Sequence, residues 1–405
     1  MRKEKTKKIT QAMTFIIIMG VVSLFSDMTH EGASSIRGEY LSLLGASASV
    51  IGFVSGLGEL VGYGLRFVFG RITDKTKKYW FMTILGYFID VVCVPTLALV
   101  NKNGWIWACV LLILERTGKA IKKPAKSTIV SFAASQEGAG KSFAVQEALD
   151  QIGAFLGPVM LYFVLKYKQG TTLDKYSAAF AFLTIPAVLT MVSLFFAKKK
   201  FPNPENFEPE SKKTVNFRKS PSFILYIAGI SFFSFGFIDF SLVTMHVANN
   251  HMFTDSQLPL IYALAMIVDA VSALFFGNMY DKKGFSALVW STVVSSLFSL
   301  FIFGFQNKSI VMLGIILWGI GMGAQESILK AAVSTMIPKA SRAAGYGIFE
   351  LSFGLFWFLG SWILGILYEK SIIAMITLSV VSQLISVPFY IISEKKIKSE
   401  QNSEN

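Results

Sequence analysis

The sequence predicts an all-α membrane protein, with twelve transmembrane helices in two pseudo-symmetric six-helix bundles. Of its 405 residues, 53% are hydrophobic and only 16% are charged, whereas about a quarter of a soluble domain is charged. Long apolar runs recur from one end of the chain to the other, and their continuity favours spanning helices over alternating β-strands. A Gly-Asp-Lys turn motif occurs twice, roughly half a chain apart, which indicates a duplicated unit.

Each predicted span is an apolar run of roughly the 20 residues that a helix needs to cross a bilayer. Short polar segments separate the runs and predict the connecting loops. The expected spans are residues 11–33, 46–69, 79–100, 104–121, 143–165, 176–197, 221–249, 256–279, 285–305, 308–334, 343–367 and 371–393.

Basic residues sort to one side of this topology. Most Lys and Arg residues fall on the side that holds both termini. Positively charged loops stay in the cytoplasm, so we expect a multi-pass protein of the cell (inner) membrane with both termini cytoplasmic. The net charge of +13 is then an orientation signal in contact with the lipid bilayer, and it gives no support to nucleic-acid binding.

The longest polar segment divides the chain into two halves. Residues 198–220 are rich in Lys and contain Pro202, Pro204 and Pro209, a composition typical of a linker. We therefore predict a first six-helix bundle over 1–197, a cytoplasmic linker over 198–220 and a second six-helix bundle over 221–393. The polar residues 394–405 are predicted to form a disordered cytoplasmic tail.

The two halves carry matching residues in the same order. The turn motif reads Gly70-x-x-x-Asp74-Lys75, with Lys78 after it, in the first half, and Gly277-x-x-x-Asp281-Lys282 in the second. Acidic residues recur as well, because Glu115 corresponds to Glu326 and Asp27 to Asp239 at similar offsets. Together these matches predict two halves of the same topology, related by an axis along the membrane normal.

At this point the chain resembles the major facilitator superfamily, and in particular its drug/proton antiporter-type members. The resemblance implies a conformational latch on the cytoplasmic face, formed by Gly70, Asp74, Lys75, Lys78, Gly277, Asp281 and Lys282. Thr76 stands where the family has a second Gly, whereas the second copy keeps it as Gly284. The alternative is an ordinary solvated turn.

A second motif lies in the fifth predicted span. Gly153, Gly157 and Pro158 resemble the family's antiporter motif, although the further glycines of that motif are missing. The resemblance favours export of the solute. The alternative is a small-residue contact between helices with a Pro kink, a common device for packing helices in membranes.

Charged residues within the predicted spans are candidates for coupling protons and substrate. An ionised group at the centre of a bilayer costs roughly 2.5–3.5 kcal/mol on insertion scales. Acids outnumber bases in the set, which predicts that some acids are protonated, hydrated in a cavity, or paired with a cationic substrate or ion. The candidates are Asp27, Glu31, Glu59, Glu115, Arg116, Asp239, Asp269 and Glu326.

These candidates divide by what their own helix offers them. Glu115 and Glu326 each have a Lys four residues later, so ion pairing along one helix is the structural alternative. Glu59 and Asp269 have no such neighbour and are the better candidates for proton or substrate work. Arg116 resembles the family's fourth-span arginine, to which the resemblance assigns a role in proton coupling.

No cofactor or metal site is predicted. The three histidines, His30, His246 and His251, fall near the outer ends of spans one and seven, and no ligand spacing accompanies them. We interpret them as polar caps. The two cysteines lie inside apolar runs and predict no disulfide framework.

The sequence therefore predicts a monomeric secondary transporter and not an enzyme. Alternating access, driven by protons as the coupling ion, would export a small organic solute that is cationic or amphiphilic. Uptake of a nutrient or ion, coupled to protons or sodium, is the alternative within this class. A lipid scramblase or a membrane-embedded enzyme is the alternative outside it.

Overall fold

The computed structural model describes residues 10–207, 220–337 and 342–404. Every regular element within these ranges is a helix. The first half contains α1 (Gln11–Ser34), α2 (Arg37–Leu43), α3 (Ala48–Thr76), α4 (Tyr79–Thr96), η1 (Leu97–Leu99), α5 (Trp105–Glu137), α6 (Ala139–Tyr167), α7 (Thr172–Phe182) and α8 (Thr184–Lys200). A short helix, η2 (Pro204–Phe207), follows it.

The second half repeats this plan with more interrupted helices. It contains α9 (Pro221–Gly236), α10 (Phe240–Asn249), α11 (Gln257–Lys283), α12 (Ser286–Ser296), α13 (Phe298–Phe303), α14 (Lys308–Ala324), η3 (Gln325–Leu329), α15 (Lys330–Met336), α16 (Arg342–Lys370) and α17 (Ile372–Glu404). One turn of π-helix, η3, interrupts the tenth span. Such interruptions often mark functional sites.

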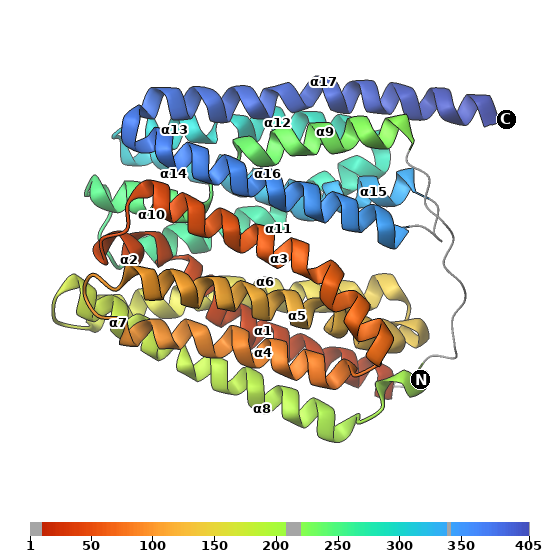
Figure 1. Ribbon diagram of the computed structural model, residues 1–405, viewed down its shortest axis with the longest axis horizontal. Helices are drawn as coiled ribbons and strands as arrows, with labels where there is room; N and C mark the ends of the chain where they lie inside the picture. The colour runs from red at the N-terminus through yellow and green to blue at the C-terminus, as the bar shows by residue number, and fades with distance from the viewer. Residues whose placement is uncertain (1–9, 208–219, 338–341, 405) are drawn as a thin grey trace, which may run out of the picture.

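The twelve-helix prediction is confirmed. Eleven helical segments within the described residues are long and apolar enough to cross a membrane. The twelfth is α5, whose first 18 residues carry four charged side chains, Glu115, Arg116, Lys119 and Lys122. Figure 1 shows α5 running beside α4 along the whole bundle.

Three boundaries differ from the sequence prediction. The fourth span, expected at 104–121, continues through Pro124 to Glu137 in α5. The first turn motif is helical as far as Thr76, and only Lys77, with a φ of 52°, and Lys78 form the turn. The tail expected to be disordered over 394–405 continues α17 as far as Glu404. The tail keeps helical hydrogen bonding because Glu, Lys and Gln, which are good helix formers, make up most of it.

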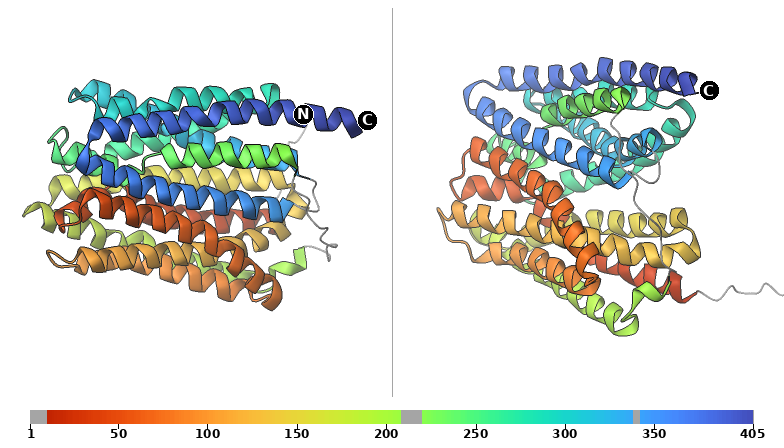
Figure 2. Two further views of the ribbon diagram at one scale, coloured as in Figure 1. Left: turned by 45° about the horizontal axis from the view of Figure 1, so that its top comes forward. Right: turned by 45° about the vertical axis from the view of Figure 1, so that its right-hand side comes forward.

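The halves meet mainly along three pairs of helices: α3 with α16, α6 with α11, and α2 with α10, and α3 also contacts α10. The start of α1 and the end of α17 lie at the same end of the bundle, which we call the terminal end (Figure 1). The opposite end, where α2 and α10 lie, is the distal end. Figure 2 shows the two halves diverging toward the terminal end.

Glycines hold the halves together at the distal end. A Cβ on Gly38 would lie 1.7 Å from the carbonyl oxygen of Ser241, and one on Gly52 would lie 2.2 Å from that of Ser361. Farther along α3, a Cβ on Gly62 would meet nothing within 4 Å. Close backbone packing therefore seals the distal end. Contacts between α3 and α16 continue as far as Gly64 with Leu351 and Arg66 with Glu350, and only the part of α3 beyond these residues turns away from α16 (Figure 1).

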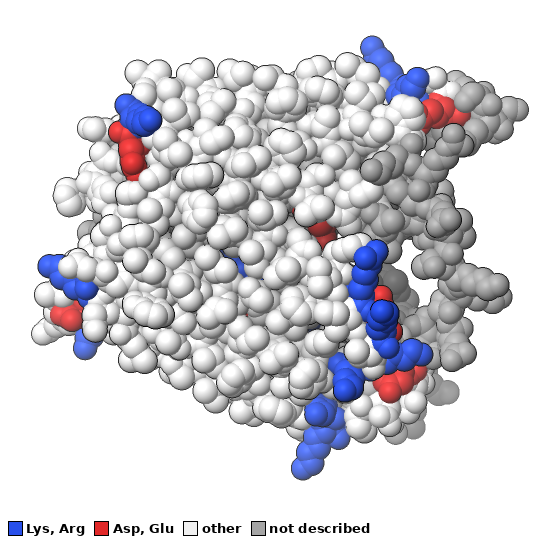
Figure 3. Space-filling model, viewed as in Figure 1, with Lys and Arg blue, Asp and Glu red and all other residues white. Residues whose placement is uncertain are grey.

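The outer surface suits a lipid environment. Large apolar side chains such as Phe81, Val192 and Phe275 are 59%, 59% and 63% exposed. In Figure 3 the charged residues gather at the two ends of the viewed face, with a band almost free of charge between them. This pattern is expected of a protein whose middle faces hydrocarbon and whose ends face water.

Within the first half, α1 and α6 pack through the predicted antiporter-like motif. A Cβ on Gly153 would lie 2.3 Å from the carbonyl oxygen of Leu24, and one on Gly157 would lie 2.3 Å from that of Met28. Pro158, next to Gly157, lies inside the same helix. The motif thus has a structural role, because its glycines allow two backbones to approach closely.

We predict that Gly157→Ala lowers the free energy of unfolding by about 1–3 kcal/mol, because the new methyl group must push α1 away from α6. Gly62→Ala is the matched control, since its methyl group enters open space and gains up to about 1 kcal/mol of helix propensity. Thermal unfolding of the purified variants measures both. Equal stability of the two variants would contradict the tight contact.

Candidate functional site

Two adjoining cavities lie between the halves. The central cavity, of about 160 Å³, is lined by α1, α3, α5, α11, α14 and α16, with Arg37 and Asp239 near its distal end. The vestibule, of about 570 Å³, is lined by α1, α5, α6 and α11 on the terminal side of the central cavity. Glu31, Lys119 and Lys123 line both.

A column of cations on α5 faces these cavities. Arg116, Lys119, Lys123 and Lys126 are spaced by three and four residues, which places them on one face of the helix. All four line the central cavity, the vestibule or both. Because α5 extends beyond residue 121, the lysines expected in a cytoplasmic loop are part of the cavity wall.

Arg116 is the centre of a buried charge network. Its Nη2 lies 2.8 Å from Oε1 of Glu59 on α3, and its Nε lies 3.6 Å from Oε2 of Glu115. Glu115 in turn contacts Nδ1 of His30 at 2.5 Å. The side chain of Glu115 is only 2% exposed, so an ionised form needs these partners.

The lysines of α5 bind acids on other helices of the first half. Lys122 pairs with Asp90 of α4 and donates to the Ser26 hydroxyl at 2.8 Å. Lys126 lies 3.9 Å from Asp150 of α6. These contacts connect α5 to α4, α1 and α6. The ion pairs therefore hold the helices of the cavity wall in place and also give the wall its charged side chains.

Polar contacts cross between the halves around the central cavity. Arg37 donates from Nε to the Ser241 hydroxyl at 3.0 Å and lies 3.6 Å from Asp239. The Tyr262 hydroxyl donates to Glu31 at 2.5 Å. An ion pair of 3.2 Å between Arg66 of α3 and Glu350 of α16 also joins the halves.

A buried acid lies beside the distal seal. Glu39 of α2 is 7% exposed, and its Oε2 has no hydrogen-bond partner among the described residues. Burial and the nearby charge of Asp255 raise the pKa of Glu39 to about 8. The carboxyl group is therefore largely protonated at neutral pH.

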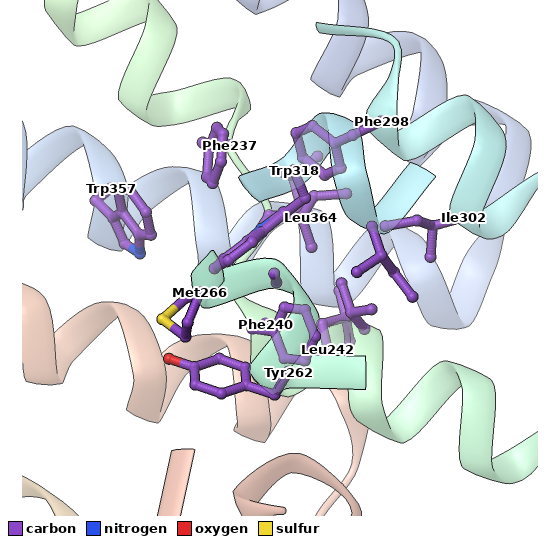
Figure 4. Packing of buried hydrophobic residues seen from close by; sticks show 14 of the residues in the cluster. Phe237, Phe240, Leu242, Tyr262, Met266, Phe298, Ile302, Trp318, Trp357 and Leu364 are labelled. Carbon is purple, nitrogen blue, oxygen red and sulfur yellow. The ribbon is translucent and has the colours of Figure 1, made fainter. Parts of the chain in front are cut away.

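The second half contributes mainly aromatic side chains. Phe240 packs on Tyr262 and Trp318, with ring centroids 4.7 and 4.8 Å apart. Trp357 lies near them and packs on Phe353 at 5.3 Å. Figure 4 shows Phe240, Tyr262, Trp318 and Trp357 approaching one another from four helices. All of these residues line the central cavity and form what we call the aromatic wall.

Two vestibule acids have no cationic partner. Asp27 of α1 and Glu147 of α6 form no ion pair within 4.0 Å among the described residues. Asp27 lies within the electric field of Asp150, Lys119, Lys122 and Lys126. Both carboxyl groups face the cavity, where protons can reach them.

Six of the predicted coupling residues line the two cavities. They are Asp27, Glu31, Glu59, Arg116, Asp239 and Asp269. Glu115 lies behind the wall in the buried network. Glu326 belongs to η3, but its side chain lies outside the described residues.

Two expectations about these residues require correction. Glu59, expected to lack a partner on its own helix, pairs instead with Arg116 of the neighbouring helix α5, and this does not contradict the expectation. Glu115 pairs with His30 and Arg116, and no ion pair joins it to Lys119. The excess of acids disappears because α5 places further lysines in the wall. The lining cations are Arg37, Arg66, Arg116, Lys119, Lys122, Lys123 and Lys126, and the lining carboxylates are Asp27, Glu31, Glu59, Glu147, Asp150, Asp239 and Asp269.

The predicted latch residues do not meet in this conformation. Asp74 and Asp281 are exposed, and neither forms an ion pair among the described residues. A Cβ on Gly70 would lie 3.7 Å from Pro124, and one on Gly277 would meet nothing within 4 Å. Lys75, Lys78 and Lys282 are exposed at the same terminal end. The latch remains a prediction for a state in which this end is closed.

Sequence reasoning missed the roles of His30, Arg37, Lys122, Lys126, Tyr262 and Trp357. The spacing of the lysines after residue 121 could have revealed the α5 residues, since it continues the helical period beyond Pro124. Cross-half contacts such as Tyr262 with Glu31 have no signal in the sequence, because their residues are 231 positions apart.

His30, Asp90 and Glu115 offer three donor atoms within 4.8 Å of one another. Lys122 already forms an ion pair with Asp90, and His30 contacts Glu115 directly. We therefore interpret this cluster as a network of charge pairs and not as an ion site, which also corrects the expectation that His30 is a polar cap. His246 bonds to Tyr368 at 3.0 Å and is likewise buried.

Two six-helix halves enclosing a charged cavity, sealed at one end, define a membrane transporter. The family model described as Major Facilitator Superfamily matches residues 9–361 and 224–405. The chain belongs to this superfamily. Its membership indicates a transporter and not an enzyme.

An uncharacterised protein of Mycobacterium tuberculosis is 35% identical over 390 residues, covering 94% of this chain and 93% of that protein. A bacterial homologue of the human lysosomal transporter Spinster, solved in an inward-facing and occupied conformation, matches with a TM-score of 0.73 and 12% identity, over 94% of this chain and 96% of that one. A D-xylose–proton symporter matches with a TM-score of 0.70 and 12% identity, over 94% and 96%.

We predict that Arg116→Met lowers the stability of the folded protein by roughly 3–5 kcal/mol, because Glu59 loses its cation in a buried site. Adding Glu59→Gln should restore much of this loss, since the second change removes the uncompensated charge. The apparent melting temperature of purified single and double variants tests the pair. A double variant no more stable than Arg116→Met would contradict the assignment.

Proposed function

We propose that the chain is a proton-coupled secondary transporter that exports a small amphiphilic organic solute across the cell (inner) membrane as a monomer. Both termini are placed in the cytoplasm, so the described conformation corresponds to an inward-open state. The excess of Lys and Arg at the terminal end supports this orientation through the positive-inside rule. Figure 3 shows the larger group of basic residues at that end of the viewed face.

The observation that carries proton coupling is the pair of vestibule acids without cationic partners. Asp27 and Glu147 line a cavity that lies on the cytoplasmic side in this orientation. Carboxyl groups near other acids in a partly dry cavity can exchange protons at physiological pH. The D-xylose–proton symporter of the same fold is consistent with proton coupling but does not establish it for this chain.

Alternating access follows from the contacts between halves. The distal seal, formed by Arg37 with Asp239 and Ser241, must break before the central cavity can open outward. The terminal ends of α3 and α16 must then approach. Proton binding to the vestibule acids removes negative charge from this region and favours that approach.

Export rests on the resemblance of Gly153, Gly157 and Pro158 to the antiporter motif. Uptake of a nutrient or ion remains the alternative direction, and sodium the alternative coupling ion. Direction and coupling ion are both measurable in cells that lack their main efflux pumps, by comparing intracellular solutes with and without expression of the chain.

We predict that expression depletes a set of intracellular organic solutes, that a protonophore abolishes the depletion, and that Asp27→Asn reduces it at least tenfold, because the side chain can no longer carry a proton. Glu394→Gln is the control, since its exposed pair with Lys398 contributes little. Mass spectrometry of extracts, normalised to protein in the membrane, gives the result. Depletion that follows a sodium gradient, or accumulation of solutes, would refute proton-coupled export.

We also predict that Asp74→Asn slows export several-fold while expression and membrane insertion stay near normal. Asp281→Asn should act in the same direction but more weakly. The reason is that the latch residues contact one another only when the terminal end closes. Export at the normal rate by both single variants and by the double variant would remove the latch from the mechanism.

A further inference from the structure

We infer that the transported solute is an organic anion with a planar apolar body, whose acidic group binds Lys119 and Arg116 of α5 while its body lies on the aromatic wall. This inference deepens the proposed function and rests on it, because it names the charge and shape of the solute. It replaces the cationic solute expected from the sequence.

The charge balance of the central cavity favours an anion. Its wall holds five cationic groups and three carboxylates, and the three arginines among the cations are in ion pairs, which leaves Lys119 with no ion pair among the described residues. Each of its carboxylates is also engaged: Glu59 by Arg116, Asp239 by Arg37, and Glu31 by the Tyr262 hydroxyl. A cationic solute would have to break one of these contacts, whereas an anion meets positive charge that is already present.

Lys119 is the cation best placed to bind the acidic group. It lies on the cavity-facing side of α5, one turn from Arg116, and lines both cavities. Among the described residues it forms no hydrogen bond and no ion pair within 4.0 Å, although its charge acts on Asp27, His30 and Glu31. Arg116 adds a fixed positive charge beside it.

The opposite wall supplies the second observation. The indole Nε1 of Trp357 is buried, lines the central cavity and has no acceptor among the described residues. In Figure 4 this nitrogen and the hydroxyl of Tyr262 both point toward the helices of the first half. A buried donor without a partner is costly, so a solute with an acceptor atom would satisfy it.

The two walls belong to different halves of the protein. The acidic group of the solute would contact α5 in the first half, and its ring would contact Phe240, Trp318 and Trp357 in the second. A neutral aromatic compound would satisfy only the second half and a small inorganic anion only the first. A solute that bridges the halves can stabilise their closure around it, which is the step that alternating access needs.

Three compounds that share one ring system test the charge. Indole-3-acetate is anionic, indole-3-acetamide neutral and tryptamine cationic at neutral pH. We expect indole-3-acetate to bind the purified full-length protein at least tenfold more tightly than the other two in isothermal titration calorimetry. Tighter binding of tryptamine, equal binding of all three, or no binding of the acetate up to its solubility limit would overturn the inference.

Variants test which residues bind the acidic group of the ligand and which bind its ring. Lys119→Gln should weaken binding of indole-3-acetate about tenfold and leave the acetamide unchanged, because only the acetate carries charge. Trp357→Phe should weaken both about three- to tenfold through loss of the indole donor. Lys102→Gln, at an exposed position before α5, is the control and should change neither. Loss of acetate binding in the control, or none in Lys119→Gln, contradicts the proposed site.

Transport of the same compounds separates this inference from the proposed function. Everted vesicles with an imposed pH gradient should accumulate radiolabelled indole-3-acetate and not tryptamine. If the gradient drives tryptamine instead, proton-coupled export stands and the anion inference fails. If indole-3-acetate binds as described but moves without regard to the gradient, the anion inference stands and proton coupling fails.

Discussion

A charge buried in a membrane protein must have a partner, and this constraint shapes the first half. Helix α5 carries Arg116 and Lys122 into the bundle, where they pair with Glu59 of α3 and Asp90 of α4. Removing Asp90 would leave the charge of Lys122 buried without a counterion, at a cost of several kcal/mol, whereas Arg116 and Glu59 line the central cavity. The pairs that make the cavity polar therefore also hold its helices in place.

The second half meets this charged surface with aromatic rings and with few charges of its own. The halves are sealed at the distal end by close glycine contacts and by Arg37, and they separate toward the terminal end. The cavity is thus charged on one side and apolar on the other. A solute with both characters contacts both halves at once, so its binding and the rearrangement of the halves are linked thermodynamically.

Much of the fold was readable from the sequence because apolar runs and repeated motifs are local signals. Six of the eight proposed coupling residues line the cavities. They could be predicted because an ionised side chain within an apolar run needs a polar site. The length of α5 was misjudged because Pro124 and the neighbouring lysines resemble a loop. Partners such as Glu59 for Arg116 depend on which helices become neighbours, and no local pattern encodes that.

Paired distances between the halves test the central claim, alternating access, most directly. Spin labels replacing Lys78 and Lys283 report on the terminal end, and labels replacing Lys102 and Lys308 report on the distal end; all four positions are exposed. Arg37→Ala removes the distal ion pair and should increase the population of the outward-open conformation. Double electron–electron resonance should then show that the distance between the distal labels lengthens while the distance between the terminal labels shortens. A longer distal distance with an unchanged terminal distance, or no change in either, would contradict the account.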